Sequence, residues 1–152
     1  MPTDQSIWVH GNIVEAQTAG PYVNVVPEGF GTCFKTANQS VWFHFPLTIP
    51  AIKDGVRPTM QKVFVFYKTA GNATITNVHI FDGNKKVGGF DNLALQGDHS
   101  GAADASNTWT ISPPLTIYYG LGISVNVEFG ATAASILPQV VFHAAGADFT
   151  TP

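Results

Sequence analysis

Tryptophan and histidine recur two residues apart in two apolar segments, at Trp8 and His10 and at Trp42 and His44. Residues two apart in a β-strand share one face, so each indole would stand beside its imidazole. An exposed indole can stack on a sugar ring or another flat ligand, and the imidazole can supply a directional hydrogen bond. We therefore predict that these four residues bind a ligand, provided that the two segments are neighbours. Packing between sheets or subunits is the alternative role for the same side chains.

Histidines in apolar runs could also hold a metal ion. The candidate ligands are His10, His44, His79 and His143, with Asp82 as a carboxylate partner. A transition-metal site needs three or four donors that converge on the ion. No His-x-His or His-x-x-x-His pair brings two of these imidazoles together locally, so the fold alone would have to assemble the site. We therefore expect no bound metal and no cofactor.

The segment from Gly97 to Gly101 places a carboxylate, an imidazole and a hydroxyl next to one another, at Asp98, His99 and Ser100. A catalytic triad requires such groups to be stacked in space, whereas consecutive side chains generally diverge. The segment therefore predicts a solvated loop in which Asp98 and Ser100 cap turns. His99 is a candidate for ligand contact, and the weak catalytic candidates are His79, His99 and Asp98.

The elements that must position these residues are predicted to be strands, because helical periodicity is nearly absent. The plainest strand is Leu121 to Phe129, in which apolar residues alternate with Gly122, Ser124, Asn126 and Glu128. Such alternation predicts that one face of the strand lies in the core and the other faces water.

Four further segments are also predicted to be strands. Val41 to Ile49 alternates too, and Pro46 indicates an edge or a bulge because it cannot donate to a strand ladder. Gln61 to Thr69 is apolar on both faces and predicts a central strand. The turn at residues 69–72 predicts a hairpin to Ala73 to Phe81, and Asp-Gly at residues 82–83 predicts another to Lys85 to Asp91. We expect these last three strands to form a meander.

The second half of the chain begins with a polar stretch, Gln96 to Asn107, that predicts a long exposed loop. Short strands are predicted at Thr108 to Ile111 and Leu115 to Tyr119, separated by two prolines, and a last strand at about Gln139 to Ala144. The whole pattern predicts one all-β domain over residues 1–152, a two-sheet antiparallel β-sandwich with jelly-roll or Greek-key-like connections. A closed β-barrel is the alternative.

Composition narrows the possible partners. Only 11% of the 152 residues are charged, whereas 45% are hydrophobic, and so few charges on large surfaces favour a homo-oligomer. The net charge of -3 and the scattered Lys and Arg residues argue against nucleic acid. No stretch resembles a membrane span or a signal peptide, so we expect no membrane association. The lone Cys33 favours a cytoplasmic location over an oxidising one.

Three functions remain open on these observations. The first is a non-catalytic binding or assembly module that recognises a carbohydrate or another small ring-bearing ligand through Trp and His. The second is a small hydrolase, isomerase or cyclase with a His and Asp pocket, with or without a metal. The third is a structural protein that associates with itself. We favour the first, because the catalytic candidates form no motif that places a nucleophile beside a base.

Overall fold

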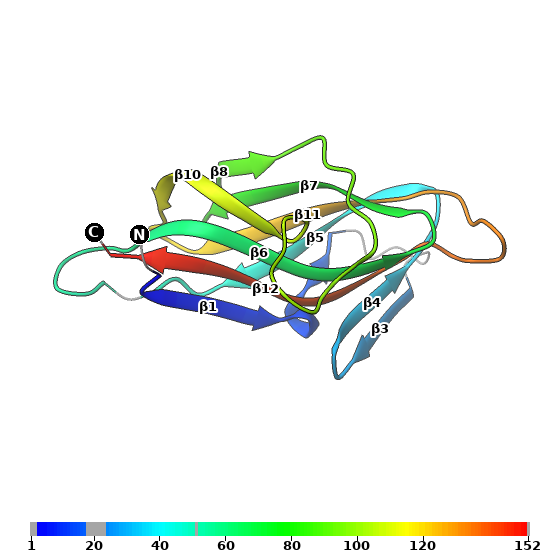
Figure 1. Cartoon of the computed structure of the whole chain (residues 1–152), viewed down its shortest axis with the longest axis horizontal. Helices are drawn as coiled ribbons and strands as arrows, with labels where there is room; N and C mark the ends of the chain where they lie inside the picture. Colours follow the sequence, from blue (N-terminus) through cyan, green and yellow to red (C-terminus); the bar gives the residue numbers. More distant parts are fainter. Residues whose placement is uncertain (1–2, 18–23, 51, 152) are drawn as a thin grey trace.

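The computed structural model describes residues 3–17, 24–50 and 52–151, and it consists of two antiparallel β-sheets packed face to face (Figure 1). We call them sheet A and sheet B. Sheet A has the strand order β10 (Thr108–Thr116), β6 (Thr59–Ala70), β12 (Gln139–Thr150), β4 (Gly31–Lys35) and β3 (Asn24–Glu28), with β1 (Gln5–His10) beside β12 and β9 (Asp98–His99) beside β6. Sheet B has the order β2 (Glu15–Ala16), β5 (Gln39–Leu47), β11 (Leu121–Phe129), β7 (Ala73–Asp82) and β8 (Lys85–Phe90).

This architecture confirms the predicted two-sheet sandwich, and the two sheets of the described chain do not close into a barrel. One short 3-10 turn, η1 (Gly11–Ile13), is the only helical element in the described residues, and none of their helices is long and apolar enough to cross a membrane.

The core between the sheets follows the predicted alternation. The apolar face of β11 is fully buried, and so is that of β5, whose members are Val41, Phe43, Phe45 and Leu47. Strand β6 is central as predicted, because it lies between β10 and β12. Pro46 is not one of the two β5 residues that pair with β2. Its missing N–H therefore interrupts no hydrogen bond between β5 and β2 in the described residues.

The predicted meander is wrong in its first half. Strands β6 and β7 do not pair, because the turn at residues 69–72 carries the chain from sheet A to sheet B. Each of the two strands buries an apolar face in the sandwich. The sequence pattern that results is the same whether the two strands pair within one sheet or pack against each other from different sheets. The second hairpin, between β7 and β8, is present.

Two predicted boundaries are also wrong. The last strand does not end near Ala144 but continues to Thr150, with Ala145, Ala147 and Phe149 buried. Alanine is only weakly apolar, so the alternation in this half of the strand was too weak to predict it. The two short strands predicted around the prolines form one strand, β10, with a register shift between Thr110 and Leu115.

Candidate functional site

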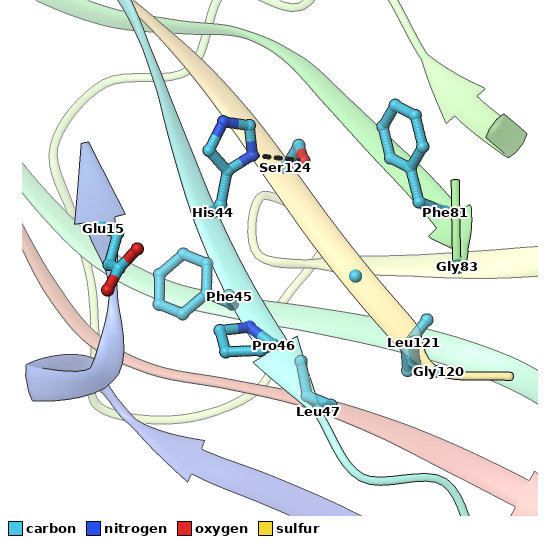
Figure 2. A pocket seen from close by; sticks show the side chains of 11 residues that line it. Glu15, His44, Phe45, Pro46, Leu47, Phe81, Gly83, Gly120, Leu121 and Ser124 are labelled. Carbon is cyan, nitrogen blue, oxygen red and sulfur yellow. Dashed lines mark hydrogen bonds between the residues drawn. The ribbon is translucent and has the colours of Figure 1, made fainter. Parts of the chain in front are cut away.

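The outer face of sheet B is hollowed along its three central strands, β5, β11 and β7. Strand β11 places Ser124 opposite both His44 and His79, and it places Gly122 opposite both Pro46 and Phe81. Since Gly122 has no side chain, the surface sinks between its two neighbours. The larger of two hollows, about 530 Å³, lies there, and a smaller one of about 260 Å³ adjoins it; both are lined by His44, Phe81 and Ser124. We call the two hollows together the sheet-B groove; Figure 2 shows the residues that line the larger one.

Aromatic side chains lie along the groove. The half-buried Trp42 packs against the imidazole of His79, with ring centroids 4.7 Å apart and planes at 42°. Phe81 follows His79 on the same face of β7, and Figure 2 shows its ring standing up from the sheet, across β11 from His44. Indole and phenyl faces therefore flank a polar centre, which suits a ligand with both apolar and hydroxylated surfaces.

His44 and Ser124 form that polar centre. Nδ1 of His44 lies 2.8 Å from Oγ of Ser124, and its Nε2 lies 3.0 Å from Oε1 of Gln17. The amide oxygen of Gln17 can only accept, so Nε2 carries the proton and Nδ1 accepts from the Ser124 hydroxyl. Burial lowers the pKa of His44 despite an opposing effect of Glu15. The imidazole is thus neutral near pH 7, and the floor of the groove carries dipoles rather than charges.

Charged groups gather at the β7–β8 rim. Nε2 of His79 lies 2.7 Å from Oδ1 of Asp91 and 3.2 Å from Nζ of Lys86. The ionised carboxylate of Asp91 can only accept, so Nε2 of His79 donates to it, and the ammonium of Lys86 lies beside this pair. Hydrogen bonds from His79 and from Asn77, the latter 2.6 Å long, lower the pKa of Asp91 and keep it ionised.

The predicted ligand residues are divided between the two sheets. Trp42 and His44 lie in the sheet-B groove, whereas Trp8 and His10 lie on β1 and point outward from sheet A, because Ile7 and Val9 of the same strand pack against the core. The two Trp-x-His segments therefore do not form one patch, and the condition under which we predicted a joint site is not met. Among the predicted residues the groove adds His79, which lies across Ser124 from His44.

The metal candidates do not converge. No group of three His, Cys, Asp or Glu side chains able to hold an ion occurs in the part of the chain that the structure describes. Nδ1 of His10 accepts from the backbone N–H of Asn12, and Nδ1 of His143 donates to the carbonyl of Phe30. Asp82 uses its carboxylate on three backbone N–H groups.

The Asp98, His99 and Ser100 segment forms no triad. Ser100 bonds to Asp98, while both nitrogens of His99 face acceptors, Oδ2 of Asp104 at 3.0 Å and the carbonyl of Gln96 at 2.9 Å. The hydrogen bond to Asp104 raises the pKa of His99, and partial burial only opposes it. His99 thus fastens the 96–107 loop, and it does so on sheet A, away from His79 and the groove.

Several groove residues lie outside the predicted set, notably Gln17, Phe81, Gly122 and Ser124. Gly122 and Ser124 belong to the face of β11 predicted to be wet, and nothing in their own segment separates a groove floor from ordinary solvated surface. The alternation of Asn77, His79 and Phe81 against the buried Val78 and Ile80 was the available signal for an aromatic ring on the outer face of β7.

Comparison with known proteins gives one family and a shared fold. The model of a family of unknown function, DUF6623, matches residues 1–149. No curated protein matches the chain in sequence. The xylan-binding module CBM15 is similar in structure, with a TM-score of 0.53 and 13% identity over 96% of this chain and 97% of that one. TmCBM61, solved in complex with β-1,4-galactotriose, has a TM-score of 0.50 and 13% identity over 90% of both chains. At such identities the likeness shows the fold.

Proposed function

The chain belongs to the family of unknown function DUF6623, and we propose that it is a non-catalytic, lectin-like carbohydrate-binding module whose ligand lies in the sheet-B groove. The observation that carries the proposal is the placing of Trp42 and Phe81 around the neutral His44–Ser124 pair. A sugar ring presents an apolar face that stacks on such aromatics and hydroxyl groups that bond to such dipoles.

The electrostatics of the groove favour a neutral sugar. The groove floor consists of Gly122, the hydroxyl of Ser124 and the neutral imidazole of His44. The ionised Asp91 is already bonded to His79 and Asn77 at the rim. An acidic sugar would face Glu15, which also lines the groove. The two similar folds are described as a xylan-binding module and as a complex with β-1,4-galactotriose, which supports xylan and β-1,4-galactan as the first probes.

Filling the groove tests its role. A Cβ on Gly122 would meet only the Cβ of Phe81, at 3.5 Å, so the substitution Gly122→Leu should be tolerated and should place an isobutyl group where the ligand lies. We expect affinity for the bound polysaccharide to fall at least about tenfold, measured by affinity electrophoresis or calorimetry against xylan and β-1,4-galactan.

The matched control is Gly101→Leu, at a site where a Cβ would meet nothing within 4 Å. That variant should bind like the unaltered protein. If Gly122→Leu is folded and retains full affinity, the sugar does not lie in the sheet-B groove.

We also propose that the protein forms a homo-oligomer through strand β3. This edge strand of sheet A is exposed along its length, and Val25, Val26 and Phe30 leave about half of their surfaces open to solvent. Pro27 of β3 cannot donate to a strand ladder, so we expect a second copy to pack on these exposed apolar side chains and not to extend the sheet. Sedimentation at micromolar concentration should show a dimer or larger species that the substitution Val26→Lys converts to a monomer, and a strict monomer before substitution would contradict the proposal.

A further inference from the structure

Trp8 offers a second aromatic surface, on the face of the molecule opposite the sheet-B groove. It lies on β1, which pairs with β12 in sheet A (Figure 1). The indole stacks on Phe64 with ring centroids 4.9 Å apart and planes at 29°. The ring of Phe66 meets it in an edge arrangement, with centroids 5.1 Å apart and planes at 63°. These two rings support it from below, yet 41% of Trp8 is exposed.

The position of the Trp8 ring is fixed by its other neighbours. Gly146 pairs with Trp8, and a Cβ at that glycine would lie only 2.4 Å from Cδ2 of the indole. The ring therefore lies flat over the bare backbone of β12. Its Nε1 donates to Oγ of Ser6 at 2.8 Å, and Ser6 donates to Asp148 at 2.7 Å. Since the indole N–H is used, Trp8 presents a preorganised π face to solvent.

A row of polar side chains runs beside this π face. Ser6 pairs with Asp148, Asp148 pairs with Lys62, and Lys62 pairs with Thr110, so the four lie side by side across β1, β12, β6 and β10. Each of these four residues is two positions along its strand from the residue in the cross-strand row of Trp8. Residues two apart on a strand share a face, so the polar row lies on the same face as the indole. A flat aromatic platform therefore adjoins hydroxyl, carboxylate and ammonium groups.

We infer that Trp8 is a second sugar-stacking site, which takes a pyranose ring of a neutral polysaccharide with its hydroxyls toward Lys62 and Asp148. The inference rests on the proposed function for its class of ligand but not on the groove. Because the two sites lie on opposite faces, one molecule can hold two polysaccharide chains and cross-link them.

The fluorescence of Trp8 itself can report the contact. A groove-blocked protein with Gly122→Leu and Trp42→Phe keeps only Trp8 and Trp109, and Trp109 is buried at 7% exposure. Acrylamide should quench Trp8 in this protein, and soluble xylan or β-1,4-galactan should protect it, with half-protection at about millimolar sugar because a single stacked ring binds weakly. Adding Gly146→Ala should tilt the indole and abolish protection while the indole remains.

Cross-linking gives the functional readout. The turbidity of a polysaccharide solution should rise with the otherwise unaltered protein and should not rise with Trp8→Ala, both carrying Val26→Lys so that self-association adds no valence. Trp8→Ala should still bind through its groove.

Each alternative outcome has a distinct meaning. If Trp8 stays unprotected while the groove binds sugar, the second site is wrong and the proposed function stands. If sugar protects Trp8 and the Gly122→Leu protein keeps full affinity, the second site is supported and the sheet-B groove is not a binding site. Binding at neither place overturns both. Protection that follows protein concentration without sugar identifies a self-association surface and overturns the inference.

Discussion

Replacing Trp42 with alanine should weaken polysaccharide binding by about 10- to 100-fold, the loss expected when one stacked aromatic ring is removed. Trp42 is held against His79 with ring centroids 4.7 Å apart, so its face is positioned before the ligand arrives. The truncation also leaves His79 without its ring contact at the same end of the groove. Calorimetry against the polysaccharide that the unaltered protein binds measures the effect.

A matched substitution separates stacking from a general loss of aromatic surface. Phe30→Ala removes a ring that is 58% exposed near β3, in sheet A. When all compared proteins carry Val26→Lys, so that none of them self-associates through β3, the affinity of the Phe30→Ala protein should be unchanged. Trp42→Phe keeps a smaller ring, so its affinity for the polysaccharide should lie between those of Trp42→Ala and Phe30→Ala. If folded Trp42→Ala protein binds like the unaltered protein, the stacking role is disproved; thermal unfolding of each variant verifies that the fold is intact.

Replacing Asp82 with alanine should cost about 3 kcal/mol of folding stability, because three partly buried backbone donors lose their charged partner at once. The carboxylate, which is 7% exposed, accepts from the backbone N–H groups of Tyr118, Tyr119 and Gly120 at 2.9, 2.8 and 3.3 Å. It thereby ties the chain that enters β11 to the end of β7. Urea unfolding at pH 7 should show a lower midpoint with an unchanged slope.

The pH dependence of the same variant identifies the charge as the cause. Burial alone would raise the pKa of Asp82, but the three N–H groups outweigh burial and lower it. A carboxyl whose pKa is lower in the folded state stabilises the fold above its unfolded pKa of about 4, and this contribution is lost as the pH falls through the folded value. The stability gap between the unaltered protein and Asp82→Ala should therefore narrow in acid.

The control for this prediction is Glu128→Ala, which removes an exposed carboxylate from β11. Its stability should differ little from that of the unaltered protein at pH 7. A gap between the unaltered protein and Asp82→Ala that stays constant from pH 7 down to about pH 3 would show that the side chain acts by packing and not through its charge.

Alternation along single strands allowed much of the fold to be predicted. Strand β11 begins and ends at the predicted residues, and its core face is the predicted one. Alternation describes the two faces of a strand but not its edges, so it left open which strands pair. For that reason the turn at residues 69–72 was interpreted as a hairpin, although it joins the two sheets.

The candidate site was partly predictable for the same reason. The spacing of Trp42 and His44 placed both on the outer face of their strand, where the structure has them. That Ser124 and His79 lie beside them depends on pairing across residues far apart in sequence. Gly122 contributes to the groove because it has no side chain. Its role could not be predicted without knowing which side chains lie on either side of it.

Strand β12 has a consequence for the order in which the chain can fold. It pairs with β6 along one edge and with β4 and then β1 along the other, so sheet A cannot form until residues 139–150 have left the ribosome. Sheet B has all its strands by Phe129, but its apolar face has nothing to cover it before then. Folding must therefore wait until β12 has been made, and most contacts close long loops, which slows folding. A nascent chain stalled before β12 would expose both apolar faces and would depend on chaperones.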